Sequence, residues 1–192
     1  MIYIRQINID DFNEIVKIHK DVFADHFLGQ YSANLIKRYY LQFFEKTTFL
    51  IIEENEKICG FILGGHEKTL DSCKQAFIDS NKCMYLLESI YRPQIYVKGI
   101  KKFFEYFIKN KNTQKPSQYS YRLLSMGISK NQQKKGFGKK LLNCFEKISL
   151  ANTKIYGVSC MRDNRVASNF YIKNGFNLEK KCSKSLYFYK KI

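Results

Sequence analysis

The stretch that decides the fold runs from Leu123 to Leu142 and reads LLSMGISKNQQKKGFGKKLL. Its opening run, LLSMGI, is mostly apolar and has the length of a buried strand, and a polar turn follows it. Beyond the turn, apolar residues recur about one helical turn apart. These residues are Leu141, Leu142, Phe145 and Ile148. The pattern predicts a strand, a tight turn and a helix in direct succession.

The turn has the chemistry of a pyrophosphate cradle. Gly136 and Gly138 carry no Cβ, so the backbone there can pass close to a ligand. The first amides of the following helix have no intrahelical partner and can donate to phosphate oxygens. Four lysines surround the same point: Lys134, Lys135, Lys139 and Lys140. The alternative interpretation is an ordinary tight turn with a solvated lysine cluster. Neither GxxxxGK[ST] nor GxGxxG is present.

A second stretch, residues 158–176, reads VSCMRDNRVASNFYIKNGF and predicts another strand and helix. Asp163 or Asn164 can cap this helix, and Gly175 ends it. Residues at helical spacing share one of its faces, namely Asn164, Ala167, Ser168 and Tyr171. Taken alone, Tyr171 reads as an ordinary packed aromatic side chain.

Together the two stretches resemble the GNAT acetyltransferase superfamily. The first is similar to its acetyl-CoA loop, Gln/Arg-x-x-Gly-x-Gly/Ala after a strand, at Gln133, Gly136 and Gly138. The second resembles its later motif, Asn-x-x-Ala-x-x-Phe-Tyr-x-x-x-Gly-Phe. The residues that match this motif are Asn164, Ala167, Phe170, Tyr171, Gly175 and Phe176. Because both motifs occur in order at the expected separation, the chain is identified as a member of this superfamily.

The composition is that of a globular protein. A length of 192 residues suits one domain, and 45% hydrophobic and 16% aromatic residues can fill a sizeable core. No apolar run has the length needed to cross a bilayer, and the start MIYIRQINIDDF lacks a secretory signal pattern. The six cysteines are scattered without zinc-ligand spacing. We therefore expect a cytoplasmic protein with reduced thiols and no metal.

The formal net charge of +16 raises the question of nucleic-acid binding. The lysines are spread along most of the chain, and no nucleic-acid-binding signature is present, so no specific nucleic-acid partner is predicted. A basic surface would still favour acidic partners, such as CoA, a nucleotide-linked sugar or an anionic membrane.

The remaining elements follow the order of the resembling fold. We expect a strand at 2–7, a helix from Asp10 or Asp11 to about Phe23, and a helix from Ser32. A hairpin follows at 47–53 and 57–64, and two final strands at 176–181 and 186–190. The resemblance implies an α/β fold in one domain over 1–192, with a mixed sheet of about seven strands and helices on both faces.

Residues 66–117 form an insertion before the CoA-binding strand, longer than the superfamily commonly needs there. One interpretation is an extra helical pair that packs over the sheet and shapes the acceptor pocket. The other is that the segment 98–109, with an apolar stripe and lysines elsewhere on the helical wheel, rests on a membrane or a partner as a basic amphipathic helix.

The resemblance also implies the chemistry, in which an amine attacks the thioester of acetyl-CoA directly. The backbone of Met126 and Ile128 would pair with pantetheine, and the amide of Met126 or Gly127 would polarise the thioester carbonyl. Asn164 is expected near the pantetheine arm. Tyr171 would protonate the departing thiolate as a phenol with an unperturbed pKa near 10. The pyrophosphate cradle would consist of Gln133, Lys134, Lys135, Gly136, Phe137, Gly138 and Lys139.

The sequence offers several candidates for the general base and for the amine acceptor. His26, His66, Glu88 or a backbone-held water can take the amine proton, while Cys160 is expected to be a core residue and not a nucleophile. The segment 26–40, HFLGQYSANLIKRYY, resembles surface-polysaccharide enzymes of the superfamily, which implies a small-molecule amine acceptor such as an amino sugar or nucleotide-linked sugar. The alternatives are a protein or peptide amine, or CoA binding without catalysis. The oligomeric state is left open.

Overall fold

The computed structural model describes residues 1–90 and 117–192. Its strands are β1 (Ile2–Gln6), β2 (Thr48–Glu54), β3 (Lys57–His66), β4 (Tyr121–Ile128), β5 (Ile155–Met161), β6 (Asn177–Lys181) and β7 (Ser185–Lys191). Its α-helices are α1 (Phe12–Val22), α2 (Ala33–Leu41), α3 (Glu67–Ile90), α5 (Phe137–Ser149) and α6 (Arg165–Lys173). Short 3-10 turns lie at Ile9–Asp11, Leu28–Gln30 and Lys130–Gln132.

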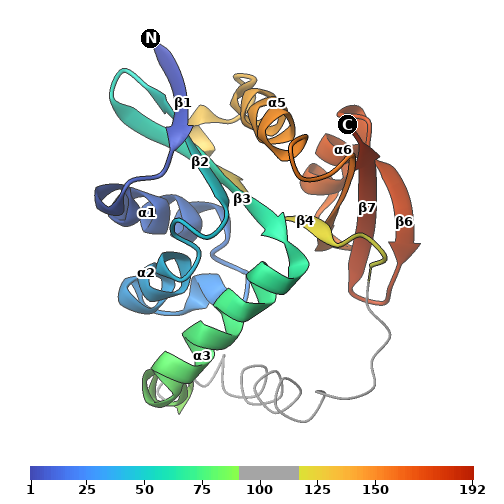
Figure 1. The fold of residues 1–192 in the computed structure, drawn as a ribbon. Coiled ribbons are helices and arrows are strands. Elements are labelled where there is room, and N and C mark those ends of the chain that lie inside the picture. The colour runs from blue at the N-terminus through green and yellow to red at the C-terminus, as the bar shows by residue number, and fades with distance from the viewer. Residues whose placement is uncertain (91–116) are drawn as a thin grey trace.

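The strands form one mixed sheet in the order β1-β2-β3-β4-β5-β7-β6 (Figure 1). Neighbouring strands are antiparallel except β4 and β5, which run parallel. A parallel pair requires a crossover connection, and here α5 provides it. The predicted mixed sheet of seven strands with helices on both faces is confirmed.

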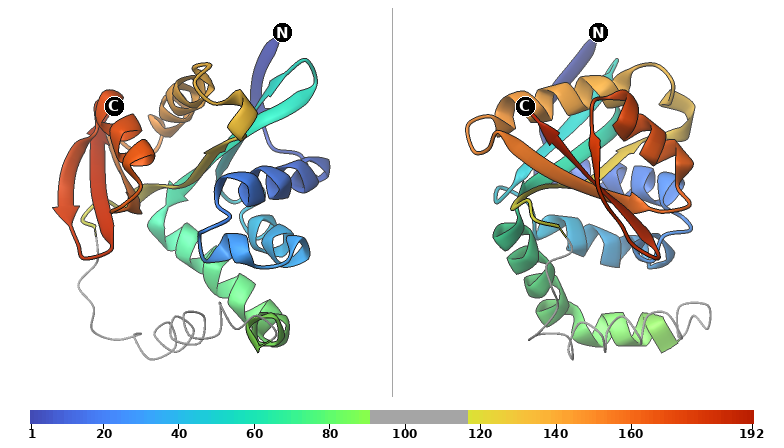
Figure 2. Two further views of the ribbon diagram at one scale, coloured as in Figure 1. Left: turned by 180° about the vertical axis from the view of Figure 1, so that it is seen from behind. Right: turned by 90° about the vertical axis from the view of Figure 1, so that its right-hand side faces the viewer.

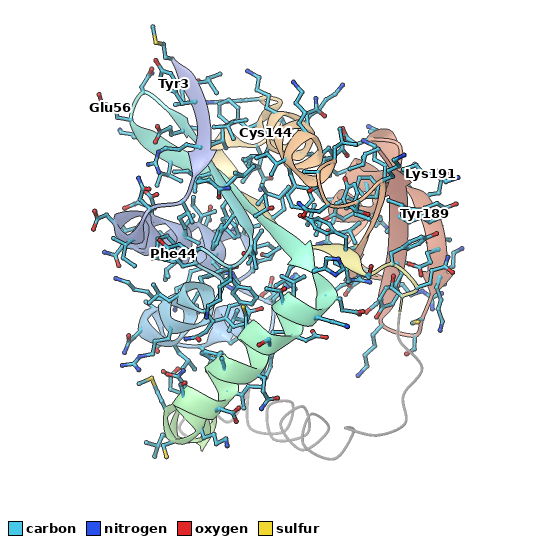
Figure 3. The ribbon with its side chains drawn as sticks, viewed as in Figure 1. Tyr3, Phe44, Glu56, Cys144, Tyr189 and Lys191 are labelled. Atoms are coloured by element: carbon cyan, nitrogen blue, oxygen red, sulfur yellow. The ribbon has the colours of Figure 1, made fainter. Side chains whose placement is uncertain are left out.

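Two hydrophobic clusters cover the two faces of the sheet. On one face, α1, α2 and α3 pack over β2 and β3 around aromatic side chains such as Phe12, Tyr40 and Phe61. On the other face, α5 and α6 pack over β3, β4, β5 and β7 around Phe145 and Tyr156. Figure 2 shows these helix layers from two further directions, and Figure 3 shows the side chains between the layers. Burial on both faces explains why β2 and β3 are apolar along most of their length.

Local signals in the sequence account for the element ends. The Ser32 side chain accepts a hydrogen bond from the amide of Leu35 and caps α2, and the Asn164 side chain caps α6 in the same way through Ala167. The β2–β3 hairpin turns through Asn55 and Glu56, both with positive φ, which suits the twist of a tight hairpin.

The insertion begins with α3, which is bent at Asn81, a residue with non-helical backbone angles. Near the far end of α3, the Glu88 carboxylate accepts hydrogen bonds from the amide and hydroxyl of Ser32, which joins α3 to the start of α2. The predicted amphipathic helix at 98–109 lies outside the described residues. Within 1–90 and 117–192, no helix combines the length and apolar character that crossing a membrane requires.

Candidate functional site

The central feature of the site is a fork between β4 and β5. The two strands pair only at Arg122 with Gly157 and at Leu123 with Val158. Beyond Leu123, β4 still pairs with β3 along its other edge, up to Ile128. The edge of β4 that faces β5 is therefore left with unpaired backbone groups from residue 124 onward. Such an edge can accept an extended ligand with amide groups as if it were another strand.

The turn after β4 presents backbone amides at the mouth of this fork. Lys134 and Gly136 have φ values of 64° and 82°, and Gly136 is the residue before the first turn of α5. A Cβ at Gly138 would lie 3.1 Å from Met126 Cε and 3.2 Å from Phe170 Cε2, so this position holds α5 close to α6 and β4. The Gln133 side chain donates to the carbonyl of Ile128 at 3.0 Å and fixes the loop on the strand.

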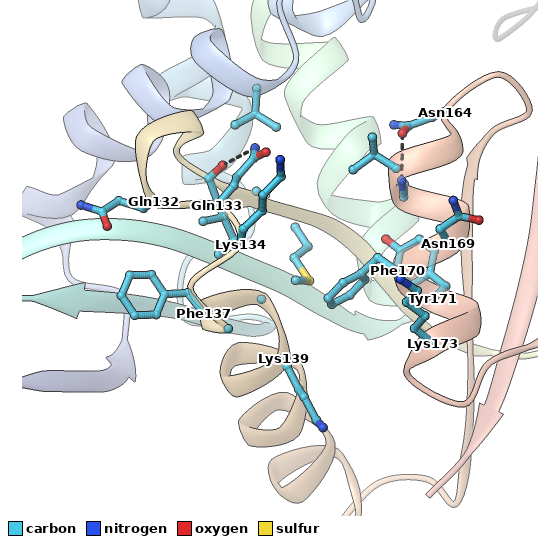
Figure 4. A pocket seen from close by; sticks show the side chains of 18 of the residues that line it. Gln132, Gln133, Lys134, Phe137, Lys139, Asn164, Asn169, Phe170, Tyr171 and Lys173 are labelled. Atoms are coloured by element: carbon cyan, nitrogen blue, oxygen red, sulfur yellow. Dashed lines mark hydrogen bonds between the residues drawn. The ribbon is translucent and has the colours of Figure 1, made fainter.

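A cavity of about 540 Å³ lies between this loop and α6 (Figure 4). The residues predicted from sequence that line it are Met126, Gly127, Ile128, Gln133, Lys134, Gly136, Phe137, Gly138, Lys139, Asn164 and Tyr171. Lys135 does not line the cavity, and its ammonium group donates to Gln132 Oε1 at 2.6 Å. The two motifs, about 30 residues apart in sequence, thus form opposite walls of one cavity.

The cavity also has walls that sequence reasoning missed. Val22 and Phe23 contribute from the end of α1, and Val166, Asn169 and Lys173 from α6. Val22 and Phe23 belong to the apolar stripe of a predicted helix, a pattern that indicates core packing and not a ligand. Val166 is 78% exposed, and an apolar residue two positions after the capping Asn164, outside the predicted shared face, was the available signal.

Tyr171 lies at the inner wall with 8% of its surface exposed. Burial raises its pKa above 10, with a smaller contribution from Cys160. The expected unperturbed pKa is therefore wrong, because desolvation disfavours the phenolate. Tyr171 remains a proton donor at neutral pH. Cys160 is partly buried against the cluster under α5 and α6, as a core residue would be.

None of the three side chains considered as general base lines the cavity. Glu88 is bonded to Ser32, His26 packs against Phe23 at 5.1 Å, and His66 packs against Tyr121 at 6.0 Å between ring centroids. Within the described part of the chain, no group of three or more His, Cys, Asp or Glu side chains is placed to hold a metal ion.

The family model described as the acetyltransferase (GNAT) family matches residues 12–176. None of the curated proteins matches the chain in sequence. Among solved structures, the PaiA N-acetyltransferase of Thermoplasma acidophilum in complex with coenzyme A is 18% identical, with a TM-score of 0.58 over 100% of this chain and 99% of that one.

Two further solved structures share the fold. The ribosomal-protein-S18-alanine N-acetyltransferase of Escherichia coli is 12% identical, with a TM-score of 0.60 over 100% of this chain and 94% of that one. The putative acetyltransferase yncA of Salmonella typhimurium with acetyl-CoA is also 12% identical, with a TM-score of 0.58 over 99% of this chain and 93% of that one. With the family model over most of its length, the chain belongs to the GNAT acetyltransferase family and is an acetyl-CoA-dependent N-acetyltransferase.

Proposed function

We propose that residues 1–192 act as one catalytic unit that transfers the acetyl group of acetyl-CoA directly to the primary amine of a small molecule, an amino sugar or a nucleotide-linked sugar. The observation that carries direct transfer is the fork between β4 and β5, where the cavity is lined from α6 by Tyr171 and from the end of α1 by Val22 and Phe23. A cofactor in the fork would have α6 with Tyr171 on one side. The face of α1 and α2 is left for the amine.

The walls of the cavity have the chemistry that acetyl-CoA requires. The loop from Gln133 to Lys139 offers free helix amides and positive charge for the pyrophosphate. The free edge of β4 offers the backbone of Met126 and the amide of Ile128 for pantetheine, while the Ile128 carbonyl already accepts from Gln133. Tyr171 supplies a protonated phenol for the departing thiolate. The side chain of Asn164 already accepts from Ala167, so its remaining amide hydrogens are what it can give a ligand.

A polar, anionic acceptor is supported by the side chains near the base of the fork. Tyr121 packs under α5, so alternation directs Arg122 to the opposite face, where its guanidinium carbon lies 5.7 Å from the centre of the Tyr187 ring. Arg122 Nη1 is buried and has no hydrogen-bond partner within 1–90 and 117–192. Tyr119, just before β4, stacks on Tyr189 of β7, the strand that also carries Tyr187, with 5.0 Å between ring centroids. A cation beside aromatic faces suits a sugar that carries a phosphate or carboxylate.

The test is an acceptor screen with acetyl-CoA in which thiol release is measured. The panel contains free amino sugars, a nucleotide-linked amino sugar, a polyamine and peptides with a free N-terminal amine. We expect the highest kcat/KM for a sugar amine and, in Arg122→Gln, a raised acceptor KM with unchanged acetyl-CoA affinity. A preference for peptides would replace the proposed acceptor class. Thiol release no faster than acetyl-CoA hydrolysis with every amine would contradict the transfer itself.

A further inference from the structure

Three side chains from three elements form a hydrogen-bonded chain that ends at the fork. His19 Nδ1 on α1 lies 2.7 Å from the Tyr40 hydroxyl on α2. The same hydroxyl lies 3.2 Å from Ser125 Oγ on β4. His19 is 4% exposed and Tyr40 is 1% exposed, whereas Ser125 is only partly buried. The chain therefore leads from the interior of the molecule to a hydroxyl at the surface of the sheet.

Ser125 occupies the point where β4 leaves β5. The last pairing between these strands is at Leu123, and the cavity lining begins at Met126. Opposite β3, Leu63 pairs with Ser125 and Gly64 pairs with Leu123, so Leu124 is an extra, bulged residue. The bulge re-aims the residue that follows it, and Tyr40 holds the Ser125 hydroxyl on the face of α1 and α2. Ser125 is thus next to the place where a thioester in the fork would meet an amine.

The direction in which these hydrogen bonds are donated follows from the protonation state of His19. Burial lowers the pKa of His19 to about 4, with smaller contributions from His26 and Lys20, so the ring is neutral at pH 7 and carries one hydrogen. His19 Nε2 is buried and has no partner within the described residues. A buried N–H without an acceptor is rarer than an acceptor without a donor. The hydrogen is therefore placed on Nδ1, which donates to the Tyr40 oxygen.

This tautomer determines where the hydroxyl hydrogens of Tyr40 and Ser125 point. Because the Tyr40 oxygen accepts from His19, its own hydrogen is directed to Ser125 Oγ. Burial raises the pKa of Tyr40, so the phenol keeps this hydrogen. Ser125 Oγ accepts from Tyr40 and its own hydrogen remains for a ligand. In the opposite tautomer Nδ1 would accept from Tyr40, and Tyr40 from Ser125, so that a proton could pass from Ser125 to His19. A buried imidazolium without an anion is unfavourable, however.

We propose that the Ser125 hydroxyl, held by Tyr40 and His19, donates a hydrogen bond to the acetyl oxygen of acetyl-CoA during transfer. The inference rests on the proposed direct transfer. As the amine nitrogen bonds to the carbonyl carbon, the carbonyl electron pair moves to the oxygen, and it returns when the carbon–sulfur bond breaks. The amine proton leaves to solvent, the thiolate takes a proton from Tyr171, and solvent returns a proton to the Tyr171 phenolate. Ser125 loses no proton and stabilises the charge on oxygen, together with an amide of β4.

The first test reads the tautomer without any turnover. In ¹⁵N-histidine-labelled protein the three histidines give three ring systems, and His19→Gln identifies the one to be assigned. We expect the His19 signals of an Nδ1–H tautomer, unchanged between pH 5 and pH 8. An Nε2–H tautomer would overturn the outward direction of the chain and favour His19 as the base.

The second test measures kcat and KM with the best acceptor of the screen. Ser125→Ala should lower kcat roughly 10- to 100-fold, somewhat less than the loss of a sole oxyanion donor, and leave the calorimetric Kd for acetyl-CoA unchanged. Ser125→Thr, which keeps the hydroxyl, should restore most of the rate. Tyr40→Phe should fall between Ser125→Ala and wild type.

Matched controls separate this effect from a loss of stability. Ser149→Ala removes another hydroxyl bonded to a tyrosine, and Tyr156→Phe removes another buried phenol, bonded to Glu146. Both controls should keep kcat. An active wild type with an unchanged kcat in Ser125→Ala would overturn this inference and leave the proposed function standing. A wild type without transfer to any amine would overturn both.

Discussion

Tyr171 illustrates how burial changes the acid–base chemistry of a single side chain. Its ring packs against Phe176 at 5.2 Å and Phe170 at 5.7 Å, between centroids, and its hydroxyl makes no hydrogen bond within the described residues. A phenol with a raised pKa gives up its proton only to a base that forms in the same dry environment. A thiolate released into the cavity is such a base, because it too is poorly solvated there.

Tyr171→Phe should therefore lower kcat by roughly 100-fold or more, in the range typical of general acids. The free energy of unfolding should change little, because no hydrogen bond to the protein is lost. The Kd for acetyl-CoA should also be preserved, as measured by calorimetric titration. Tyr156→Phe is the matched control, since it loses a 2.6 Å bond to Glu146 and should destabilise the fold while keeping kcat. An undiminished kcat in Tyr171→Phe would remove its proposed role.

His19 should make the stability depend on pH. Its pKa is about 4 in the folded chain and about 6.5 when unfolded, so the unfolded chain binds the additional proton between these values. Stability from this group is full above pH 6.5 and is lost as the pH falls toward 4, by about 3 kcal/mol in total. Urea unfolding from pH 7 to pH 4.5 should show a steeper decline for wild type than for His19→Gln. His66→Gln, at an exposed histidine, should retain the wild-type slope.

At the scale of elements, the start of α5 determines whether a phosphate can approach. Gly136 has a φ of 82° and a Cβ there would meet no atom within 4 Å, so a side chain would project into open space beside the cavity. The positive end of the helix and the adjacent lysines make this space favourable for an anion. A carboxylate placed there would compete with the pyrophosphate for the same groups.

Gly136→Asp should therefore abolish measurable acetyl-CoA binding in a calorimetric titration. Gly175→Asp is a matched control, because Gly175 has a φ of 84° and lies outside the cavity. Both variants carry the strain of a side chain at positive φ, about 1–2 kcal/mol. Only the first should lose the ligand while circular dichroism shows a folded chain. Equal affinities in the two variants would mean that the loop does not hold the pyrophosphate.

The elements themselves were predictable because each has a local signal. Ser32 and Asn164 cap helices, Gly175 ends one, and alternating or continuous apolar runs mark the strands, so the order of elements along the chain could be matched to the resembling fold. The chain of His19, Tyr40 and Ser125 was not predictable. Its members are 21 and 85 positions apart, and each alone looks like core or strand. The fork begins at residue 124, which is also the bulged residue against β3, and sequence periodicity shows neither feature.

At the scale of the whole molecule, the net charge of +16 raises the question of whether cofactor attraction is general or local. A general field would act over the whole surface, and a local one through the few cations that line the cavity, Lys134 and Lys139 among them. Salt separates the two, because the screening length falls from about 10 Å at 0.1 M to about 3 Å at 1 M. A ligand in contact with lysines still senses them when more distant charges are screened.

Two double variants with the same net charge test this. Lys134→Gln with Lys139→Gln removes two cations of the cavity, and Lys180→Gln with Lys181→Gln removes two exposed ones on the edge strand β6. We expect the first pair to weaken acetyl-CoA binding roughly 10-fold at 0.1 M salt and to flatten its dependence on salt. The second pair should bind like wild type. Equal weakening in both pairs would show that the overall charge of the molecule, and not the lysines of the loop, attracts the cofactor.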